Sequence, residues 1–305
     1  MYLSPGDKVA IIATAKNFDA HALDYAIATI CSWGLIPVKG QHLYQKHFQF
    51  AGNDDERRKD LQWSIDHPDI KAIFCARGGY GTTRIIDKID LQALHLHPKW
   101  LIGFSDITAL HFALQKQHHL SIHGPMPINF EKNAEFESLD QLKAILFGEF
   151  DNYQSFAGSP YNRSGKGEGL LIGGNLTLIH NMIGTSSDLD FSEKILFIEE
   201  VGEYLYHIDR IMTHLKRAGK LQRLHGLILG HFSGMKDNDQ PFGHTWQEII
   251  LDAVKDYDFP VAFNFPAGHE DHNNPLILGS RANLRVTGRD DSELRYSLYS
   301  TSNTV

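Results

Sequence analysis

The chain has 305 residues, of which 42% are hydrophobic and 22% are charged, and these values are typical of a globular protein and not of a disordered one. Its formal net charge of −8 argues against a nucleic-acid partner, because nucleic acids select basic surfaces. No segment approaches the roughly 18 to 20 unbroken apolar residues of a membrane span, and the N-terminal residues lack the basic-then-apolar pattern of a signal peptide, so we expect a cytoplasmic protein with no membrane partner.

A chain of this length can form two domains. Its first half alternates short apolar strands, expected at 9–13, 35–38, 70–75, 100–104 and 120–122, with helices expected at 20–33, 55–65, 106–115 and 139–147. This alternation predicts an N-terminal α/β domain, residues 1–150, with a doubly wound, mainly parallel sheet of the Rossmann or flavodoxin type. Cys31 and Cys75 lie in apolar stretches of it, which indicates core residues and not a disulfide.

Residues 151–166 are polar and irregular, and we interpret them as a linker. The remaining residues, 167–305, are predicted to form a smaller, mixed α/β C-terminal domain. Its strands are expected at 170–172, 195–199, 226–230, 261–265 and 284–287, and its helices at 176–183, 205–218 and 245–255.

Ser105 follows the apolar strand 100–104 and precedes a helical pattern, so it occupies a sharp turn between strand and helix. Such a turn exposes a serine hydroxyl as a nucleophile, and the amides that open the next helix face any oxyanion formed beside it. Gly103 leaves room for the turn, but Ile107 stands where the usual motif has its second glycine. The alternative is that Ser105 or Asp106 only caps the helix.

A carboxylate and a histidine also follow predicted strands. Glu199, Glu200 and Glu203 end an apolar strand, and His269 lies in a glycine turn after the strand 261–265. Open α/β sheets bind ligands at the carboxyl ends of their strands, and a serine nucleophile needs a histidine base held by an acid. We therefore expect an active site at the cleft between the two domains. Strand alternation allows only one of Glu199 and Glu200 to meet the histidine, and the others could cap the next helix or pair with Arg210.

The segment 77–81, Arg-Gly-Gly-Tyr-Gly, comes directly after the strand 70–75. It lacks the spacing and the lysine of a nucleotide-binding loop. Adjacent glycines let bare backbone amides approach a substrate carbonyl, so we favour an oxyanion hole over a phosphate site. A tight turn is expected under either interpretation.

The 18 histidines raise the question of a metal site. His269 and His272 have an H-x-x-H spacing, but Gly268 and Pro275 place them in a loop and not on the helix that such a motif requires. We therefore predict no metal and no cofactor. His123, in a short strand followed by a turn, is interpreted as a packed, hydrogen-bonded histidine near the expected cleft.

The motifs together resemble the LD-carboxypeptidases and their relatives, the microcin-C-immunity peptidases, which are serine peptidases with a Ser-Glu-His triad. The resemblance covers most of the chain and is carried, in this order, by the blocks 4–13, 50–58, 75–81, 103–106, 123–126, 173–176, 197–203 and 268–269. One departure is Thr14-Ala15, where the family usually has proline and serine; it affects the shape of the first loop and not the triad.

The resemblance implies that Ser105 is the nucleophile, Glu199 the acid and His269 the base. It also implies that the amides of Gly79 and Asp106 form the oxyanion hole. The implied reaction is hydrolysis of the bond between an L-diamino acid, lysine or diaminopimelate, and the terminal D-alanine of a peptidoglycan tetrapeptide during cell-wall recycling. The implied partner is a small peptide, and the implied assembly is a homodimer.

Arg77, Gly78 and Tyr80 are the candidate substrate-binding residues. Arg77 suits a terminal carboxylate because its planar fork matches two oxygens, and the alternative is a structural arginine that ties the loop to an acid such as Asp106. Two other functions stay open: an immunity-type peptidase that cleaves a peptide-nucleotide antibiotic, and a non-catalytic muropeptide-binding protein, which would be expected to lack a triad residue.

Overall fold

The computed structural model describes residues 2–297, which divide into two compact units. The first unit contains the chain up to Phe150 together with two later segments, Asn181–Leu189 and Glu270–Leu276. The second contains Asp151–His180, Asp190–His269 and the residues from Ile277 onward. No helix among the described residues combines the length and the apolar character needed to cross a membrane.

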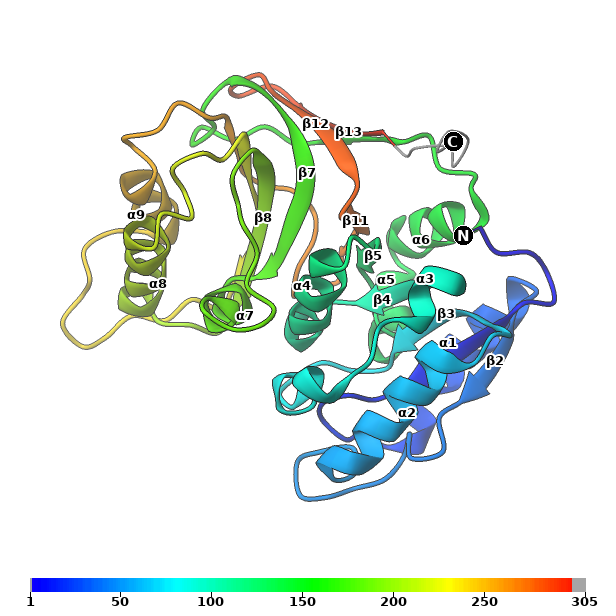
Figure 1. The fold of residues 1–305 in the computed structure, drawn as a ribbon. Helices are drawn as coiled ribbons and strands as arrows, with labels where there is room; N and C mark the ends of the chain where they lie inside the picture. The colour runs from blue at the N-terminus through cyan, green and yellow to red at the C-terminus, as the bar shows by residue number, and fades with distance from the viewer. Residues whose placement is uncertain (1, 298–305) are drawn as a thin grey trace. The chain divides into compact units, whose positions relative to one another are not determined.

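The first unit is built on a sheet in which five strands follow the order β5-β4-β3-β1-β2 (Figure 1). The pairs among β1 to β5 are parallel. The strands are β1 (Lys8–Ile12), β2 (Ile36–Lys39), β3 (Ile70–Cys75), β4 (Trp100–Gly103) and β5 (Ser121–His123). A further short strand, β11 (Leu276–Leu278), begins at the last residue that the first unit contains. The helices are α1 (Asp24–Ser32), α2 (Asp54–Asp66), α3 (Ala93–Leu96), α4 (Thr108–Lys116), α5 (Phe130–Asn133) and α6 (Ser138–Phe147).

The central strands of this sheet are apolar on both faces. Residues 9–12 of β1 are fully buried, as expected of a parallel strand covered on its two sides. Helix α2 begins at a capping box in which Asn53 and Glu56 satisfy each other's backbone amides. Alternating strands and helices thus give the parallel α/β unit that the pattern predicted.

The second unit has a seven-stranded mixed sheet in the order β10-β9-β8-β7-β12-β13-β6. Strands β7 to β10 pair in parallel, and β12, β13 and β6 are antiparallel. The strands are β6 (Tyr153–Phe156), β7 (Gly165–Asn175), β8 (Lys194–Val201), β9 (Gly226–Ser233), β10 (Val261–Ala262), β12 (Arg281–Val286) and β13 (Ser292–Ser297). Its helices are α7 (Leu176–Met182), α8 (Leu205–Arg217) and α9 (Trp246–Ala253), and α8 and α9 pack side by side (Figure 1).

Several predicted elements differ from the observed ones, and the largest differences lie in the second unit. The segment interpreted as a linker contains strand β6 and the start of β7, because these polar residues pair at the edge of a sheet that the sequence does not show. Strand β7 starts well before residue 170, where glycines hide the strand pattern. Strand β10 ends at Ala262, and Asn264 soon after it has a positive φ of 69°.

Candidate active site

Ser105 occupies the turn between β4 and α4 with a φ of 62°. A non-glycine residue in the left-handed region is uncommon, and such strain marks the turn on which α/β hydrolases mount a nucleophile. A 3-10 turn, Ser105–Ile107, leads from the strand into α4. At Gly103 a Cβ atom would lie 2.9 Å from Ile107, so glycine is required for the turn to close.

His111 of α4 holds the end of β4. Its Nε2 is 2.9 Å from the Gly103 carbonyl oxygen and its Nδ1 is 2.8 Å from the Ser121 hydroxyl. A carbonyl only accepts, so Nε2 carries the proton and Nδ1 accepts from the hydroxyl. Burial lowers the pKa of His111 to about 4, so the ring is neutral. It fixes the end of β4 two residues before Ser105.

The glycine loop after β3 packs directly against the serine turn. A Cβ atom on Gly78 would lie 3.0 Å from the Ser105 Cβ, and Gly79 has a φ of 116°. Only glycine adopts such a conformation at little cost, and the lack of side chains exposes the backbone of the loop. The structure thus brings Ser105, Gly78 and Gly79 together within the first unit.

Asp106, directly after the serine, is buried, and its carboxylate accepts a hydrogen bond of 2.8 Å from the Thr82 amide. Burial raises the pKa of the Asp106 carboxyl, while its hydrogen bonds with Thr82 and the charge of Arg57 lower it in part. The side chain therefore ties the glycine loop to the serine turn.

The structure gives Arg77 a partner other than Asp106. Its Nη1 donates a hydrogen bond of 2.8 Å to the Asn17 carbonyl oxygen. Tyr80 is 47% exposed, and its ring centroid lies 5.9 Å from that of Phe50. Among the described residues, no carboxylate pairs with Arg77, so most of its guanidinium donors remain available to a ligand.

Glu199 and His269 meet within the second unit. Glu199 lies two residues before the end of β8 with its side chain fully buried, and its Oε2 lies 2.7 Å from Nδ1 of His269. An ionised carboxylate accepts and does not donate, so Nδ1 of His269 is the donor in this contact. This arrangement prepares a histidine to act as a base.

The loop after β10 is shaped for this pair. Gly268 has a φ of 131°, and a Cβ atom there would lie 3.0 Å from the Glu199 carboxylate. The Ala267 carbonyl accepts a hydrogen bond of 2.8 Å from the His231 amide of β9. The backbone is thereby held close enough for His269 to reach the buried acid.

Glu200 has different partners. Its carboxylate accepts hydrogen bonds from the Asn175 side chain at 2.9 Å and from the amides of Thr177 and Val201 at 2.8 and 2.9 Å. Burial and the neighbouring charge of Glu199 raise the pKa of Glu200. Glu203 lies in contact with His207 instead of Arg210.

His269 and His272, which share the H-x-x-H spacing, belong to different units. His272 lies in the first unit, 3.4 Å from Glu137 and stacked on Phe136, whereas His269 belongs to the second unit. His123 lies in β5, with its ring 5.8 Å from that of Phe104. Within residues 2–297 no group of three or more histidine, cysteine or acidic side chains is placed to hold a metal ion.

We expect activity to be independent of metal. Exhaustive dialysis against a chelator, followed by an assay with and without added zinc, should leave the initial rate within about twofold of the untreated enzyme, because the base chemistry of a Glu-His pair needs no Lewis acid. Loss of activity on chelation, with recovery by one equivalent of zinc, would contradict this expectation.

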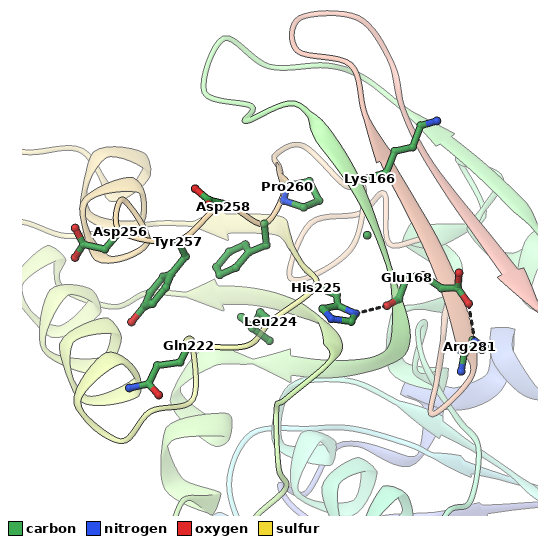
Figure 2. Close-up of a pocket in the computed structure, with 12 residues that line it drawn as sticks. Lys166, Glu168, Gln222, Leu224, His225, Asp256, Tyr257, Asp258, Pro260 and Arg281 are labelled. Atoms are coloured by element: carbon green, nitrogen blue, oxygen red, sulfur yellow. Dashed lines mark hydrogen bonds and ion pairs between the residues drawn. The ribbon is translucent and has the colours of Figure 1, made fainter.

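Figure 2 shows a hollow of about 750 Å³ in the second unit. Its lining residues place it at the amino ends of the parallel strands, whereas Glu199 lies near the carboxyl end of β8. The hollow is lined at the starts of β7, β9 and β10 by residues that include Glu168, His225 and Pro260. Glu168 pairs with Arg281 at 2.8 Å, and its carbonyl oxygen is 2.6 Å from His225 (Figure 2). Parallel sheets bind ligands at the carboxyl ends of their strands, so this hollow is not the candidate site.

The sequence analysis did not single out Arg57, although the structure places it beneath the glycine loop. Its side chain is fully buried and donates to the Gly81 carbonyl oxygen at 2.8 Å. The spacing of residues in α2 could have indicated that Arg57 is buried, because it shares a helical face with the buried Leu61 and Ile65. A charged residue on an apolar face requires a buried partner.

Comparisons with known proteins agree with these features. A profile of the LD-carboxypeptidase N-terminal domain matches residues 9–124, and one of the C-terminal domain matches residues 168–284. The probable murein peptide carboxypeptidase of Bacillus subtilis is 32% identical over 93% of this chain and 90% of its own length. The murein tetrapeptide carboxypeptidase of Pseudomonas aeruginosa is 29% identical over 91% of this chain and 92% of its own length.

Comparison with solved structures also finds carboxypeptidases of this kind. The muramoyltetrapeptide carboxypeptidase from Oxalobacter formigenes superposes with a TM-score of 0.86 at 30% identity, covering 96% of this chain and all of that one. The structure of MccF in complex with glutamyl sulfamoyl guanosine also has a TM-score of 0.86, covering 98% of both chains, but at 19% identity it shows a shared fold alone. By its sequence blocks, its domain matches and its fold, this chain belongs to the LD-carboxypeptidase family, peptidase family S66.

Proposed function

We propose that the protein is a serine LD-carboxypeptidase that releases the terminal D-alanine from peptidoglycan tetrapeptides, as a step of cell-wall recycling. The observation that carries the proposal is the hydrogen bond of 2.7 Å between Glu199 and Nδ1 of His269. The substrate is proposed from the names of full-length relatives, which are described as murein peptide and murein tetrapeptide carboxypeptidases.

In this proposal Ser105 Oγ attacks the carbonyl carbon of the L-diamino acid, and Nε2 of His269 takes the serine proton. Glu199 holds the imidazole in the tautomer with the proton on Nδ1 and stabilises the cation that forms. Collapse of the tetrahedral intermediate breaks the peptide bond, and His269 returns the proton to the leaving amine of D-alanine. Water then attacks the acyl-enzyme with His269 again as the base, which releases the tripeptide and restores Ser105.

The developing oxyanion needs donors fixed in advance. We assign that role to the amides of Gly79 and Asp106, which belong to the two segments that pack together around Ser105. Removing one such donor typically costs about 100- to 1,000-fold in kcat. Gly78, whose Cα lies against the serine, provides the close approach that a substrate carbonyl requires.

A carboxypeptidase must also bind the free carboxylate of its substrate. We assign this role to Arg77, whose one observed hydrogen bond is to the Asn17 carbonyl and leaves other donors of the guanidinium for a bidentate contact. Tyr80, exposed at the same loop, is proposed to contact the peptide.

The test compares three tetrapeptides: the free acid, its C-terminal amide, and the epimer that ends in L-alanine. Released alanine is measured by mass spectrometry. The free acid should be cleaved. The amide should lose about 100-fold or more in kcat/KM, because a neutral amide would leave the Arg77 guanidinium without the carboxylate that it binds. The L-alanine epimer should lose nearly as much, since its methyl group would point into the wall of the site.

Arg77→Gln tests whether Arg77 binds the substrate carboxylate or only supports its loop. Lys71→Gln, at an exposed position of β3, is the matched control. The amide penalty should shrink to a few-fold in Arg77→Gln and persist in the control. Equal rates on all three peptides would refute carboxypeptidase specificity, and an unchanged amide penalty in Arg77→Gln would move the carboxylate anchor elsewhere. Cleavage of a glutamyl-sulfamoyl nucleoside in place of the tetrapeptide would favour the immunity-type activity.

A further inference from the structure

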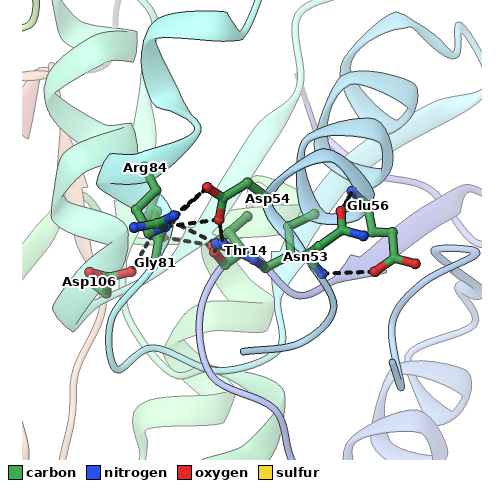
Figure 3. Close-up of polar contacts among 9 residues, drawn as sticks. Thr14, Asn53, Asp54, Glu56, Gly81, Arg84 and Asp106 are labelled. Atoms are coloured by element: carbon green, nitrogen blue, oxygen red, sulfur yellow. Dashed lines mark hydrogen bonds and ion pairs between the residues drawn. The ribbon is translucent and has the colours of Figure 1, made fainter. Parts of the chain in front are cut away.

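A buried arginine lies beneath the glycine loop of the first unit. Arg57 of α2 has no exposed side-chain surface. Its Nη1 donates to two backbone carbonyl oxygens, that of Thr14 at 2.5 Å and that of Gly81 at 2.8 Å. Its Nη2 pairs with Asp54, which also pairs with Arg84 (Figure 3). One guanidinium thus joins the loop after β1 to the loop after β3.

A second contact holds the next residue of the loop. The Thr82 amide donates to the Asp106 carboxylate at 2.8 Å, and the Thr82 hydroxyl lies 2.9 Å from that of Thr14. Thr14, Thr82 and Asp106 are all buried. The Gly81 carbonyl and the Thr82 amide belong to one peptide group, which is therefore held by Arg57 through its oxygen and by Asp106 through its N–H.

The glycine loop cannot fix its own shape. Gly79 and Gly81 have φ values of 116° and 147°, and glycine has access to more backbone conformations than any other residue. At Gly81 a Cβ atom would lie 2.6 Å from Nη1 of Arg57, so this glycine is the point where the guanidinium reaches the backbone. The conformation of the loop is imposed by contacts from outside it.

A buried charge is a costly way to fill this position. Replacing a buried ion pair by apolar side chains of similar volume is often neutral or stabilising. Burial lowers the pKa of Arg57, and the charges of Asp54 and Asp106 oppose that effect. The ring of Phe50 packs against the guanidinium at 4.9 Å. What only the arginine supplies is a pair of directed hydrogen bonds to backbone carbonyls.

We propose that Arg57 and the side chain of Asp106 are positioning residues that set the separation of the two oxyanion donors, the amides of Gly79 and Asp106. This inference rests on the proposed function, since it needs an oxyanion beside Ser105. Arg57 fixes Gly81, two residues after one donor. Asp106 carries the other donor on its own backbone and holds Thr82 with its carboxylate.

The test uses Arg57→Met, Arg57→Lys, Asp106→Ala and Asp106→Asn in the full chain. Arg58→Met is the matched control, because Arg58 lies on the same helix and pairs with the exposed Asp55. For each variant we measure kcat and KM on the tetrapeptide, the rate at which a fluorophosphonate probe labels Ser105, and the melting temperature.

Arg57→Met should lower kcat and the labelling rate in parallel by about 100-fold, since a displacement of about 1 Å at a reacting centre has an effect of that size. KM should stay within about threefold, because the ground-state contacts remain. Asp106→Ala should lose about tenfold or more in both rates. Arg57→Lys and Asp106→Asn should recover part of each loss, since each keeps one donor or acceptor, and Arg58→Met should match the wild type.

Folded Arg57→Met and Asp106→Ala proteins whose kcat and labelling rate stay within about threefold of the wild type would overturn the proposal. If Arg57→Met does not fold, Arg57→Lys and Asp106→Ala decide by the same criterion. A wild type that is labelled at Ser105 but releases no D-alanine would refute the proposed substrate, and the labelling rates would still decide on Arg57. A wild type that releases D-alanine but is not labelled at Ser105 would overturn this inference together with the nucleophile.

Discussion

Replacing Ser105 by alanine should lower kcat by about a million-fold while the protein stays folded, because loss of the nucleophile in a serine triad has an effect of that order. The turn that carries Ser105 is set by Gly103 and by the bond from His111 to the Gly103 carbonyl, and neither depends on the hydroxyl. The melting temperature should therefore change little. Initial rates of D-alanine release, measured beside a thermal melt, check both parts.

Ser186→Ala is the control for this substitution. Ser186 lies in the first unit, and its hydroxyl donates to Asp87 on the surface. Its removal should leave the rate unchanged. A folded Ser105→Ala protein that retains even a few per cent of the wild-type rate would show that Ser105 is not the nucleophile.

Glu199→Gln should lower kcat by about 10,000-fold with little change in KM, since a side-chain amide facing Nδ1 favours the wrong imidazole tautomer. Glu200→Gln is the matched control, because the two acids are adjacent and both are buried. Glu200 is bonded to Asn175, Thr177 and Val201 and not to the histidine, so its replacement should cost less than about tenfold in kcat. If Glu200→Gln lost more kcat than Glu199→Gln, Glu199 would not be the acid that acts on His269.

Glu200→Gln should also change the pH dependence of stability. Burial and the neighbouring charge of Glu199 raise the pKa of Glu200 in the folded protein above that of a free glutamate. Its contribution to stability is therefore fully present below the unfolded pKa and is lost as the pH rises through the higher folded pKa. Urea unfolding of Glu200→Gln across this window should show a smaller loss of stability with rising pH than the wild type.

The parallel sheet of the first unit follows from patterns that the sequence shows directly. Strands such as β1 and β3 are short apolar runs bounded by turn residues, and α2 begins at an Asn53-Glu56 capping box. The second sheet was harder to predict. Its edge strand β6 lies within residues that are polar and irregular in sequence, and only pairing with β13 makes them a strand.

The chain also returns to the first unit in two segments, Asn181–Leu189 and Glu270–Leu276, which the expected division at 151–166 does not contain. These returns depend on long-range contacts, such as the hydrogen bond from the Asn133 side chain to the Asp271 carbonyl. No local pattern of polarity or periodicity encodes a contact between residues 138 positions apart.

For the candidate site, the sequence could indicate that Ser105, Glu199 and His269 each lie near the carboxyl end of a strand, because strand ends are local features. It left open which glutamate meets the histidine, since that depends on the register of β8 and on the approach of Gly268. It could not predict that Arg77 binds the Asn17 carbonyl or that Arg57 reaches Gly81, because both partners are backbone atoms of distant loops.

The most direct test of the proposed serine carboxypeptidase mechanism is hydrolysis of a murein tetrapeptide by the purified protein in water enriched in oxygen-18. We expect D-alanine and tripeptide in equal amounts, with the heavy oxygen in the new carboxylate of the tripeptide. Ser105→Ala and Glu199→Gln should release neither product. Cleavage at any other bond, an intact tetrapeptide, or equal turnover by the Ser105→Ala protein would contradict this mechanism.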